Sequence, residues 1–587
     1  MPEVPEVPEV TVRLVPHPDL GAVDLCLSAS AHRDQLVRAV RSAVPNGHRV
    51  RLLPYGVTLP ASAAHLLQAG LPGFVLEGSA GQRFVANRAW ARASHARTLQ
   101  QLRRLVDGGP EVVDQVLGET TRLRPLDLHQ RLNVAAMTLP GSVGLCVFDE
   151  QGAGKTVTAL FAFDRLFERG EVDLALIVAP KSMVPEWKED CERFFGDLYR
   201  VQLLVGDHRE KAAAAWADAE ILVTNFETVV SLEHQLVSRI GSSPRGATLV
   251  VDESFFVKNR ASRRAGAAKR VREHCTRAFV LCGTPAPNSA VDLIEQFNTV
   301  DFGVAFDGER IPVDRAAAQA RVGQIVAQRG LYVRHLKADV LPGLPTRQVS
   351  RLRVSLSPQQ RELYDRLSAG LVADLRAVDD DTFARERLTY MQRRAALLQV
   401  CSCPWVVDPT YDETPGKSGT LDALLAELVG HLGEKVVLWA FFRETLEHLT
   451  HRYRDYGVVR YDGTVTGVDE RREAIRAFQR DDDVRLFVGN PAAAGAGITL
   501  HAARYSVYVA LSNQAAHYLQ SLDRIHRRGQ TRPVESIVLL ADQTIELSEF
   551  DRLERKQLEA RHLLRDEDQQ LPTRDELLHE LLAALEM

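Results

Sequence analysis

The stretch Asp149-Glu150-Gln151-Gly152-Ala153-Gly154-Lys155-Thr156 decides the fold, because its residue types suit a loop that cradles phosphate. An apolar run at residues 143–148 precedes it and predicts a buried parallel strand, while residues 157–167 predict the helix that follows. The order strand, loop and helix is that of a phosphate-binding unit in a parallel sheet. The strict phosphate-loop pattern is broken at one position, since residue 149 is Asp rather than Gly.

Each residue type in this loop has a chemical reason to be there. Gly152 and Gly154, with Ala153 between them, let backbone N–H groups turn onto phosphate oxygens at the positive end of a helix dipole. Lys155 adds a positive charge, and the hydroxyl of Thr156 can hold Mg²⁺. The loop therefore predicts that ATP binds here with Mg²⁺, provided that the other parts of an ATP site follow along the chain.

Composition limits the class of protein but does not identify it. The chain has 587 residues, 45% of them hydrophobic, which suggests roughly three to four domains. A net charge of -5 gives no global sign of nucleic-acid binding, so any basic surface has to be local. Seven scattered cysteines do not form a disulfide framework, and Cys401-x-Cys403 lacks the second pair of a zinc site. With no signal peptide and no long apolar run, we expect a cytoplasmic location and no membrane partner.

An acidic pair supplies the second part of an ATP site. Residues 248–251 predict a buried strand that runs directly into Asp252 and Glu253. Two carboxylates at the tip of a core strand are costly unless they meet a cation, and ATP-bound Mg²⁺ supplies one. We expect Asp252 to take part in the metal site, and Glu253 to orient and deprotonate the attacking water.

Polar residues follow two further predicted strands, at residues 174–178 and 221–223. Lys181 comes after the first, and Thr224 and Asn225 come after the second. The loops beyond the carboxyl ends of parallel strands lie at one edge of the sheet, so we expect these residues on the same rim as Lys155. They suit contacts with nucleic-acid phosphates, although turn formation alone also explains each of them.

A basic run and a glutamine each allow two interpretations, one as a ligand-binding feature and one as an ordinary structural feature. Lys258 begins a run, to Arg272, of seven basic residues without an acidic one, which is either a nucleic-acid contact or a solvated face. Gln130 lies on a predicted helix before the phosphate-loop strand, where its amide can recognise an adenine edge or be an ordinary helix glutamine.

The second half of the chain again alternates predicted strands and helices, from residue 435 to residue 530, which predicts a second doubly wound sheet. Gly497 and Thr499 lie in a glycine-containing loop that can approach a phosphate or a nucleic-acid backbone closely. Arg524 and Arg527 share one face of a predicted helix at residues 520–530, from which both could reach the γ-phosphate. By contrast, Gly416-Lys417-Ser418-Gly419 resembles a phosphate loop only superficially and is interpreted as linker.

Taken together, the motifs resemble helicase superfamily two and, within it, the Swi/Snf-type (Snf-two) family of ATP-dependent DNA translocases. The resemblance extends over roughly residues 120–545 and is carried by the order and spacing of these segments: residues 149–156, Asp252-Glu253, Gly283-Thr284-Pro285, residues 334–340, Asp462-Gly463-Thr464 and residues 520–530. It implies an α/β fold with two RecA-like doubly wound parallel-sheet lobes, helical protrusions and a small α/β N-terminal accessory domain. It also implies a DNA-stimulated ATP hydrolase that uses ATP and Mg²⁺ and moves along double-stranded DNA without separating the strands.

Five parts follow from this resemblance: residues 1–118 as the accessory domain, 119–310 as the first lobe, 311–415 as a helical protrusion and linker region, 416–545 as the second lobe and 546–587 as a helical tail. The first and last parts are the expected docking sites for partner proteins. The chain departs from the family pattern at Ser254-Phe255 and at residues 511–513. An alternative function is therefore an ATP-gated DNA-binding clamp or scaffold in a multiprotein complex related to defence or transcription.

Overall fold

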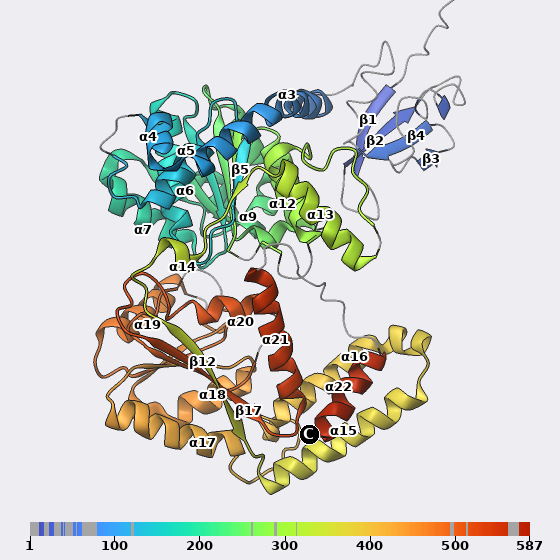
Figure 1. Ribbon diagram of the computed structural model, residues 1–587, viewed down its shortest axis with the longest axis vertical. Coiled ribbons are helices and arrows are strands. Elements are labelled where there is room, and N and C mark those ends of the chain that lie inside the picture. The colour runs from blue at the N-terminus through green and yellow to red at the C-terminus, as the bar shows by residue number, and fades with distance from the viewer. Residues whose placement is uncertain are drawn as a thin grey trace, which may run out of the picture. The chain divides into compact units, whose positions relative to one another are not determined.

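The structure is a computed structural model, and its described residues form two compact units, one ending at Val340 and the other beginning at Leu341. Figure 1 shows the elements of each unit. The structure describes residues 11–16, 23–28, 37–38, 40, 51–53, 56–60, 79–118, 122–259, 262–283, 285–286, 290–312, 314–465, 467–493, 498–511, 515–561 and 574–586. Within these ranges no helix is both long enough and apolar enough to cross a membrane.

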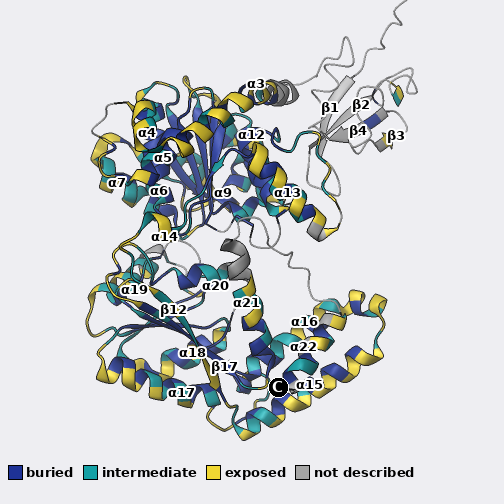
Figure 2. Ribbon diagram, viewed as in Figure 1, coloured by how far each residue is buried: buried dark blue, intermediate teal, exposed yellow. Residues whose placement is uncertain are grey.

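The first unit is built on a seven-stranded sheet in which every strand pairing is parallel, in the order β11-β5-β10-β9-β6-β8-β7. Its strands are β5 (Gly144–Val147), β6 (Leu174–Ala179), β7 (Val201–Leu203), β8 (Ile221–Asn225), β9 (Ala247–Asp252), β10 (Arg277–Leu281) and β11 (Tyr332–Val333). The central strands are buried along their whole length, as expected for a parallel sheet covered by helices (Figure 2). This confirms the first predicted α/β lobe.

Helices connect these strands and cover the sheet. They are α4 (Gly109–Leu117), α5 (Leu128–Met137), α6 (Lys155–Glu168), α7 (Val184–Phe195), α8 (His208–Ala214), α9 (Phe226–Ser231), α10 (Glu233–Gly241), α11 (Arg263–Arg272), α12 (Asp292–Asp301), α13 (Arg315–Arg329) and α14 (Lys337–Val340). Apolar side chains from strands and helices form one large core, which includes Phe148, Leu176, Val251 and Phe297.

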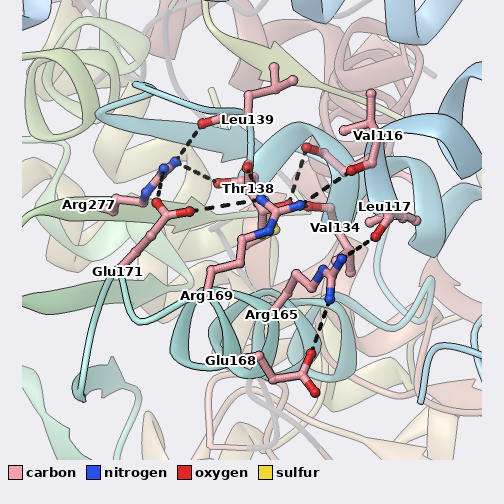
Figure 3. Close-up of polar contacts among 12 residues, drawn as sticks. Val116, Leu117, Val134, Thr138, Leu139, Arg165, Glu168, Arg169, Glu171 and Arg277 are labelled. Atoms are coloured by element: carbon pink, nitrogen blue, oxygen red, sulfur yellow. Dashed lines mark hydrogen bonds and ion pairs between the residues drawn. The ribbon is translucent and has the colours of Figure 1, made fainter. Parts of the chain in front are cut away.

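Three arginines bind the carboxyl ends of α4 and α5 (Figure 3). Arg277 is buried, and Arg165 and Arg169 are partly buried. Arg169 donates hydrogen bonds to the carbonyl oxygens of Thr138 and Val116, at 2.8 and 3.3 Å, and Arg165 donates to that of Leu117. Arg277, at the start of β10, donates to the carbonyl of Leu139 at 2.9 Å. The last carbonyls of a helix lack partners within the helix, so guanidinium groups at this point both satisfy and anchor the helix ends.

The N-terminal part contains a separate antiparallel sheet in the order β1-β2-β4-β3. Its strands are β1 (Thr11–Pro16), β2 (Val23–Ser28), β3 (Arg51–Leu53) and β4 (Gly56–Pro60). The long helix α3 (Ser79–Asp107) follows, and Arg88 on it forms an ion pair with Asp307 at 2.9 Å while Ala91 packs beside Val143. Thus α3 lies against the first lobe, although the sequence grouped it with the accessory domain.

The second unit contains a six-stranded parallel sheet in the order β12-β17-β16-β13-β15-β14. Its strands are β12 (Arg347–Val354), β13 (Val436–Trp439), β14 (Val458–Tyr461), β15 (Leu486–Gly489), β16 (Tyr505–Tyr508) and β17 (Val534–Ala541). Its helices are α17 (Gly416–Leu425), α18 (Arg443–Arg452), α19 (Val468–Arg480), α20 (Ala515–Leu522) and α21 (Ile545–Arg561). Apolar cores lie on both faces of this sheet, which confirms the second predicted lobe.

A helical protrusion completes the second unit. The helices α15 (Pro358–Ala377) and α16 (Asp380–Val400) pack together, and α22 (Arg574–Glu586) packs against α15. Leu577 and Leu581 of α22 are fully buried in the core that these helices share. These two leucines of the tail therefore pack on their own protein.

Two local predictions for the second unit are wrong. Residues 416–419 are not linker but the first turn of α17, where Lys417 is buried and forms an ion pair with Glu546 at 2.7 Å. The helix predicted over residues 520–530 ends at Leu522, so Arg524 and Arg527 lie in the turns that follow α20 and not on a helical face.

Candidate functional site

The phosphate loop connects β5 to α6 in the predicted order of strand, loop and helix. Gly152 and Gly154 both adopt a left-handed conformation with φ of 87°, which glycine reaches without strain, and Gly154 directly precedes α6. The ammonium group of Lys155 donates to the carbonyl oxygens of Asp149 and Glu150, at 2.9 and 3.3 Å. The backbone N–H groups of the first turn of α6, including that of Thr156, have no partners within the helix and suit an anion.

The carboxylate of Asp149 anchors this loop to two other parts of the first unit. One oxygen accepts from the side-chain amide of Asn133 on α5 at 2.6 Å. The other accepts from the backbone N–H and from the imidazole Nδ1 of His335, both at 2.9 Å. His335 follows β11, which pairs with the phosphate-loop strand. The sequence analysis missed His335 and Asn133, because neither lies close to the loop along the chain.

Gln130 lies at the loop but is engaged with the protein. Its side-chain carbonyl accepts from the N–H of Asp127 at 3.0 Å and so helps to cap α5, while its amide donates to the carbonyl of Ala153 at 3.4 Å. A Cβ at Gly154 would lie 2.2 Å from the same amide nitrogen, so a larger residue there would displace the Gln130 amide in addition to straining the backbone. Recognition of adenine by Gln130 stays a prediction.

The acidic pair lies at the carboxyl end of β9, and both side chains are 2% exposed. Asp252 accepts hydrogen bonds from the indole N–H of Trp187 at 3.1 Å and from the N–H of Glu253 at 2.9 Å. Burial, and then the carboxylate of Glu253, raise the pKa of Asp252 well above its ordinary value, while the charge of Lys155 opposes the rise. A cation would relieve this buried negative charge, so Asp252 fits the predicted Mg²⁺ site.

A second set of contacts connects the acidic pair to the end of β10. The hydroxyl of Ser254 donates to the side-chain carbonyl of Gln296 at 2.6 Å, and the amide of Gln296 donates to the carbonyl of Pro285. Ser254 is one of the departures from the family pattern, and it is fully buried. The sequence did not indicate that Gln296, on α12, takes part.

Among the residues predicted to contact nucleic acid, Lys181 follows β6 as expected, whereas Thr224 and Asn225 are the last two residues of β8. Lys181 is exposed. The side chain of Asn225 caps α9 by accepting from the N–H of Thr228 at 2.9 Å, and Thr224 is fully buried. Lys258 forms an ion pair with Asp292 at 2.8 Å. Of the two lysines predicted to contact nucleic acid, Lys181 is thus exposed to solvent, whereas Lys258 is ion-paired.

The basic run after Lys258 is largely neutralised within the fold. Arg264 pairs with Glu227, Lys269 with Glu295, and Arg270 with Glu233. Arg272 is buried and donates to the carbonyl oxygens of Val143, Cys275, Thr299 and Val300. The spacing of the charges in sequence does not reveal these acidic partners, which lie on α9, α10 and α12.

In the second unit, both predicted arginines contact the loop that precedes β16. Arg524 is fully buried and its guanidinium donates to the carbonyl of Ile498 at 3.5 Å, while Arg527 donates to the hydroxyl of Thr499 at 3.3 Å. The amide of Gln479 also donates to the carbonyl of Thr499 at 2.6 Å. The prediction for Gly497 lies outside the described residues. The roles predicted for Arg524, Arg527 and Thr499 stay predictions.

Comparisons with known proteins agree with this arrangement. The SNF2-related domain matches residues 129–403, and the helicase conserved C-terminal domain matches residues 419–529. The chain belongs to the Snf2 family of helicase superfamily two. This confirms the resemblance found in the motifs, and the family class supports an ATP-hydrolysing enzyme.

Individual Snf2-family relatives are distant. The human protein "SWI/SNF-related matrix-associated actin-dependent regulator of chromatin subfamily A member 1" is 27% identical over 440 residues, which are 70% of this chain and 40% of that protein. An "uncharacterized ATP-dependent helicase" of Mycoplasma pneumoniae is 24% identical over 411 residues, 68% of this chain and 38% of that protein. The solved Sulfolobus solfataricus SWI2/SNF2 ATPase core in complex with dsDNA has 19% identity and a TM-score of 0.34, over 75% of this chain and 92% of that one. This chain thus spans about 40% of the length of these curated relatives.

Proposed function

We propose that this Snf2-family chain hydrolyses ATP and uses the energy to move along, or remodel complexes on, double-stranded DNA. The observation that carries the proposal is the meeting, at the carboxyl edge of one parallel sheet, of the phosphate loop with Lys155 and the buried pair Asp252 and Glu253. These groups supply the cation, the metal-binding carboxylate and the base that phosphoryl transfer to water requires.

Each residue has a defined role in the proposed reaction. The phosphate loop and Lys155 would bind the β- and γ-phosphates, and Thr156 and Asp252 would hold Mg²⁺. Mg²⁺ bound there would supply positive charge to offset the charge on the phosphate oxygens. Glu253 orients the attacking water and accepts its proton. Arg524 and Arg527 of the second unit stabilise the γ-phosphate charge, a contribution worth about 10³- to 10⁵-fold in rate for arginine fingers.

Action on DNA is proposed from the family and from the chemistry of the rim. Relatives are named as chromatin regulators and as an ATP-dependent helicase. Lys181 in the first unit and Thr499 in the second are the proposed phosphate contacts, and duplex DNA is the proposed partner. Because the basic run is ion-paired, we propose that DNA contacts are few and directed at the backbone, which favours movement along a duplex without strand separation.

The test is steady-state ATP turnover with and without duplex DNA. Lys155→Ala and Glu253→Gln should each remove most turnover, while the matched control Lys188→Ala, an exposed lysine of α7, should leave it unchanged. Near-normal turnover in both site variants would refute the assigned site.

Displacement of a triplex-forming strand then measures movement along the duplex. Displacement supports translocation, whereas duplex-stimulated hydrolysis without displacement would favour the ATP-gated clamp.

A further inference from the structure

Gln151, the third residue of the phosphate-loop motif, has its side chain directed away from the loop and toward the acidic pair. Its amide nitrogen lies 2.6 Å from Oε1 of Glu253, to which it donates a hydrogen bond. The side chain is 7% exposed. The phosphate loop is thereby connected directly to the carboxylate proposed to activate water.

The backbone at Gly283 leaves just enough room for this side chain. A Cβ added to Gly283 would lie 2.8 Å from Cγ, and 2.9 Å from both Cδ and Nε2, of Gln151. These distances are too short for non-bonded atoms, so a methyl group at this position would displace the Gln151 amide. Three segments therefore meet here: the phosphate loop, the segment directly after β9 and the segment directly after β10.

The Glu253 carboxylate is held asymmetrically. Oε1 accepts from Gln151, whereas Oε2 is buried and has no hydrogen-bond partner among the described residues. The backbone of Glu253 is left-handed with φ of 48°, an uncommon conformation for a residue other than glycine. A buried carboxylate oxygen without a partner is unfavourable unless a ligand supplies a donor, and the attacking water is such a donor.

We propose that Gln151 is a positioning residue for ATP hydrolysis, which holds one oxygen of Glu253 so that the other faces the attacking water. This inference rests on the proposed function. Gln151 does not touch the nucleotide in this role and acts only through Glu253. Its amide donates to the carboxylate, which fixes the side chain in one orientation before the water arrives.

The first test is Gln151→Met, which keeps the length of the side chain and removes the donor. We expect kcat for ATP to fall about tenfold to a hundredfold, the range that one hydrogen bond to a charged group represents. The KM for ATP and the Kd of a non-hydrolysable ATP analogue should stay within about twofold of the wild type. Gln202→Met, a substitution of the same type in β7, is the matched control.

The second variant reaches the same contact from the opposite side. Gly283→Ala should push the Gln151 amide off Glu253 and lower kcat to a similar extent, although the Gln151 side chain itself is intact. The double variant Gln151→Met/Gly283→Ala should then be no slower than Gln151→Met alone, because both changes remove one interaction.

A double-mutant cycle with Glu253 distinguishes positioning from a purely structural role. In a Glu253→Gln background, Gln151→Met should lower the residual turnover by less than about twofold, since its effect passes through the missing carboxylate. Wild-type kcat in Gln151→Met, or a full additional loss in the Glu253→Gln background, would overturn the inference. Normal turnover in Glu253→Gln itself would instead overturn the proposed function, so the two failures are distinguishable.

Discussion

The buried ion pair between Lys417 and Glu546 offers the sharpest test of how the second unit is held together. Both side chains are 2% exposed and their charged atoms lie 2.7 Å apart. Lys417 also donates to the carbonyl of Val509 at 2.7 Å, and Glu546 accepts from the N–H of Ala541 at 2.9 Å. The pair thus joins the first turn of α17, the end of β16 and the start of α21.

Replacing only Lys417 should destabilise the second unit strongly. In Lys417→Met the Glu546 carboxylate stays buried with the Ala541 N–H as its donor, and an uncompensated buried charge costs about 3–5 kcal/mol. In Lys417→Met/Glu546→Gln no charge is left buried, and the glutamine carbonyl can still accept from Ala541. The double variant loses the donor to Val509, worth about 1 kcal/mol, so we expect it to be within about 2 kcal/mol of the wild type.

Urea unfolding followed by pulse proteolysis measures both values, because fragments from residues after Leu341 report on the second unit separately. The decisive comparison is between the single and double variants. A loss below about 1 kcal/mol in Lys417→Met, or an equal loss in both variants, would refute the argument that burial of unpaired charge sets the cost.

Two further predictions concern stability. Burial raises the pKa of Asp190 on α7 to about 6 from 3.8, so the folded state favours the protonated carboxyl. The stability that Asp190 gives to the first unit is therefore fully present below about pH 4 and is lost as pH rises through 6. Asp190→Asn should therefore stabilise the first unit by about 1 kcal/mol at pH 7.5, after allowance for its partial exposure, and by nothing at pH 4, as urea titrations at the two pH values will show. Leu581→Ala should cost about 2–5 kcal/mol, since Leu581 is fully buried, and should expose α22 to protease; an unchanged cleavage rate would contradict the packing of α22 on α15.

The two parallel sheets were predictable because their signals are local. Uninterrupted apolar runs such as Leu174–Ala179, each followed by a helix, specify buried strands without knowledge of their neighbours. Helix ends were less predictable. The pattern of residues 520–530 is compatible with a helix, but the backbone leaves α20 at Leu522, where Arg524 becomes buried against residues 498–500. Tertiary contacts there override helix propensity.

The candidate site was predictable where chemistry lies within one motif, and not where it is assembled from distant segments. Lys155 and the pair Asp252 and Glu253 were identified from residue type and position after a strand. The acidic partners of the basic run could not be, since Glu233 and Glu295 lie on separate helices that only the fold brings together. A run of positive charge in sequence is therefore weak evidence for a positive surface.

Asp149 shows how a departure from a motif can carry information. At this position the strict phosphate-loop pattern has glycine, which has no side chain to bond. Here the Asp149 carboxylate accepts hydrogen bonds from Asn133 on α5 and, twice, from His335 after β11. The backbone carbonyl of Asp149 accepts a further hydrogen bond from Lys155. One residue thus connects the loop to α5, to the segment after β11 and to Lys155. Loss of that carboxylate would free the loop at both sides at once, so the substitution that weakens the motif match is the one that fixes the loop in place.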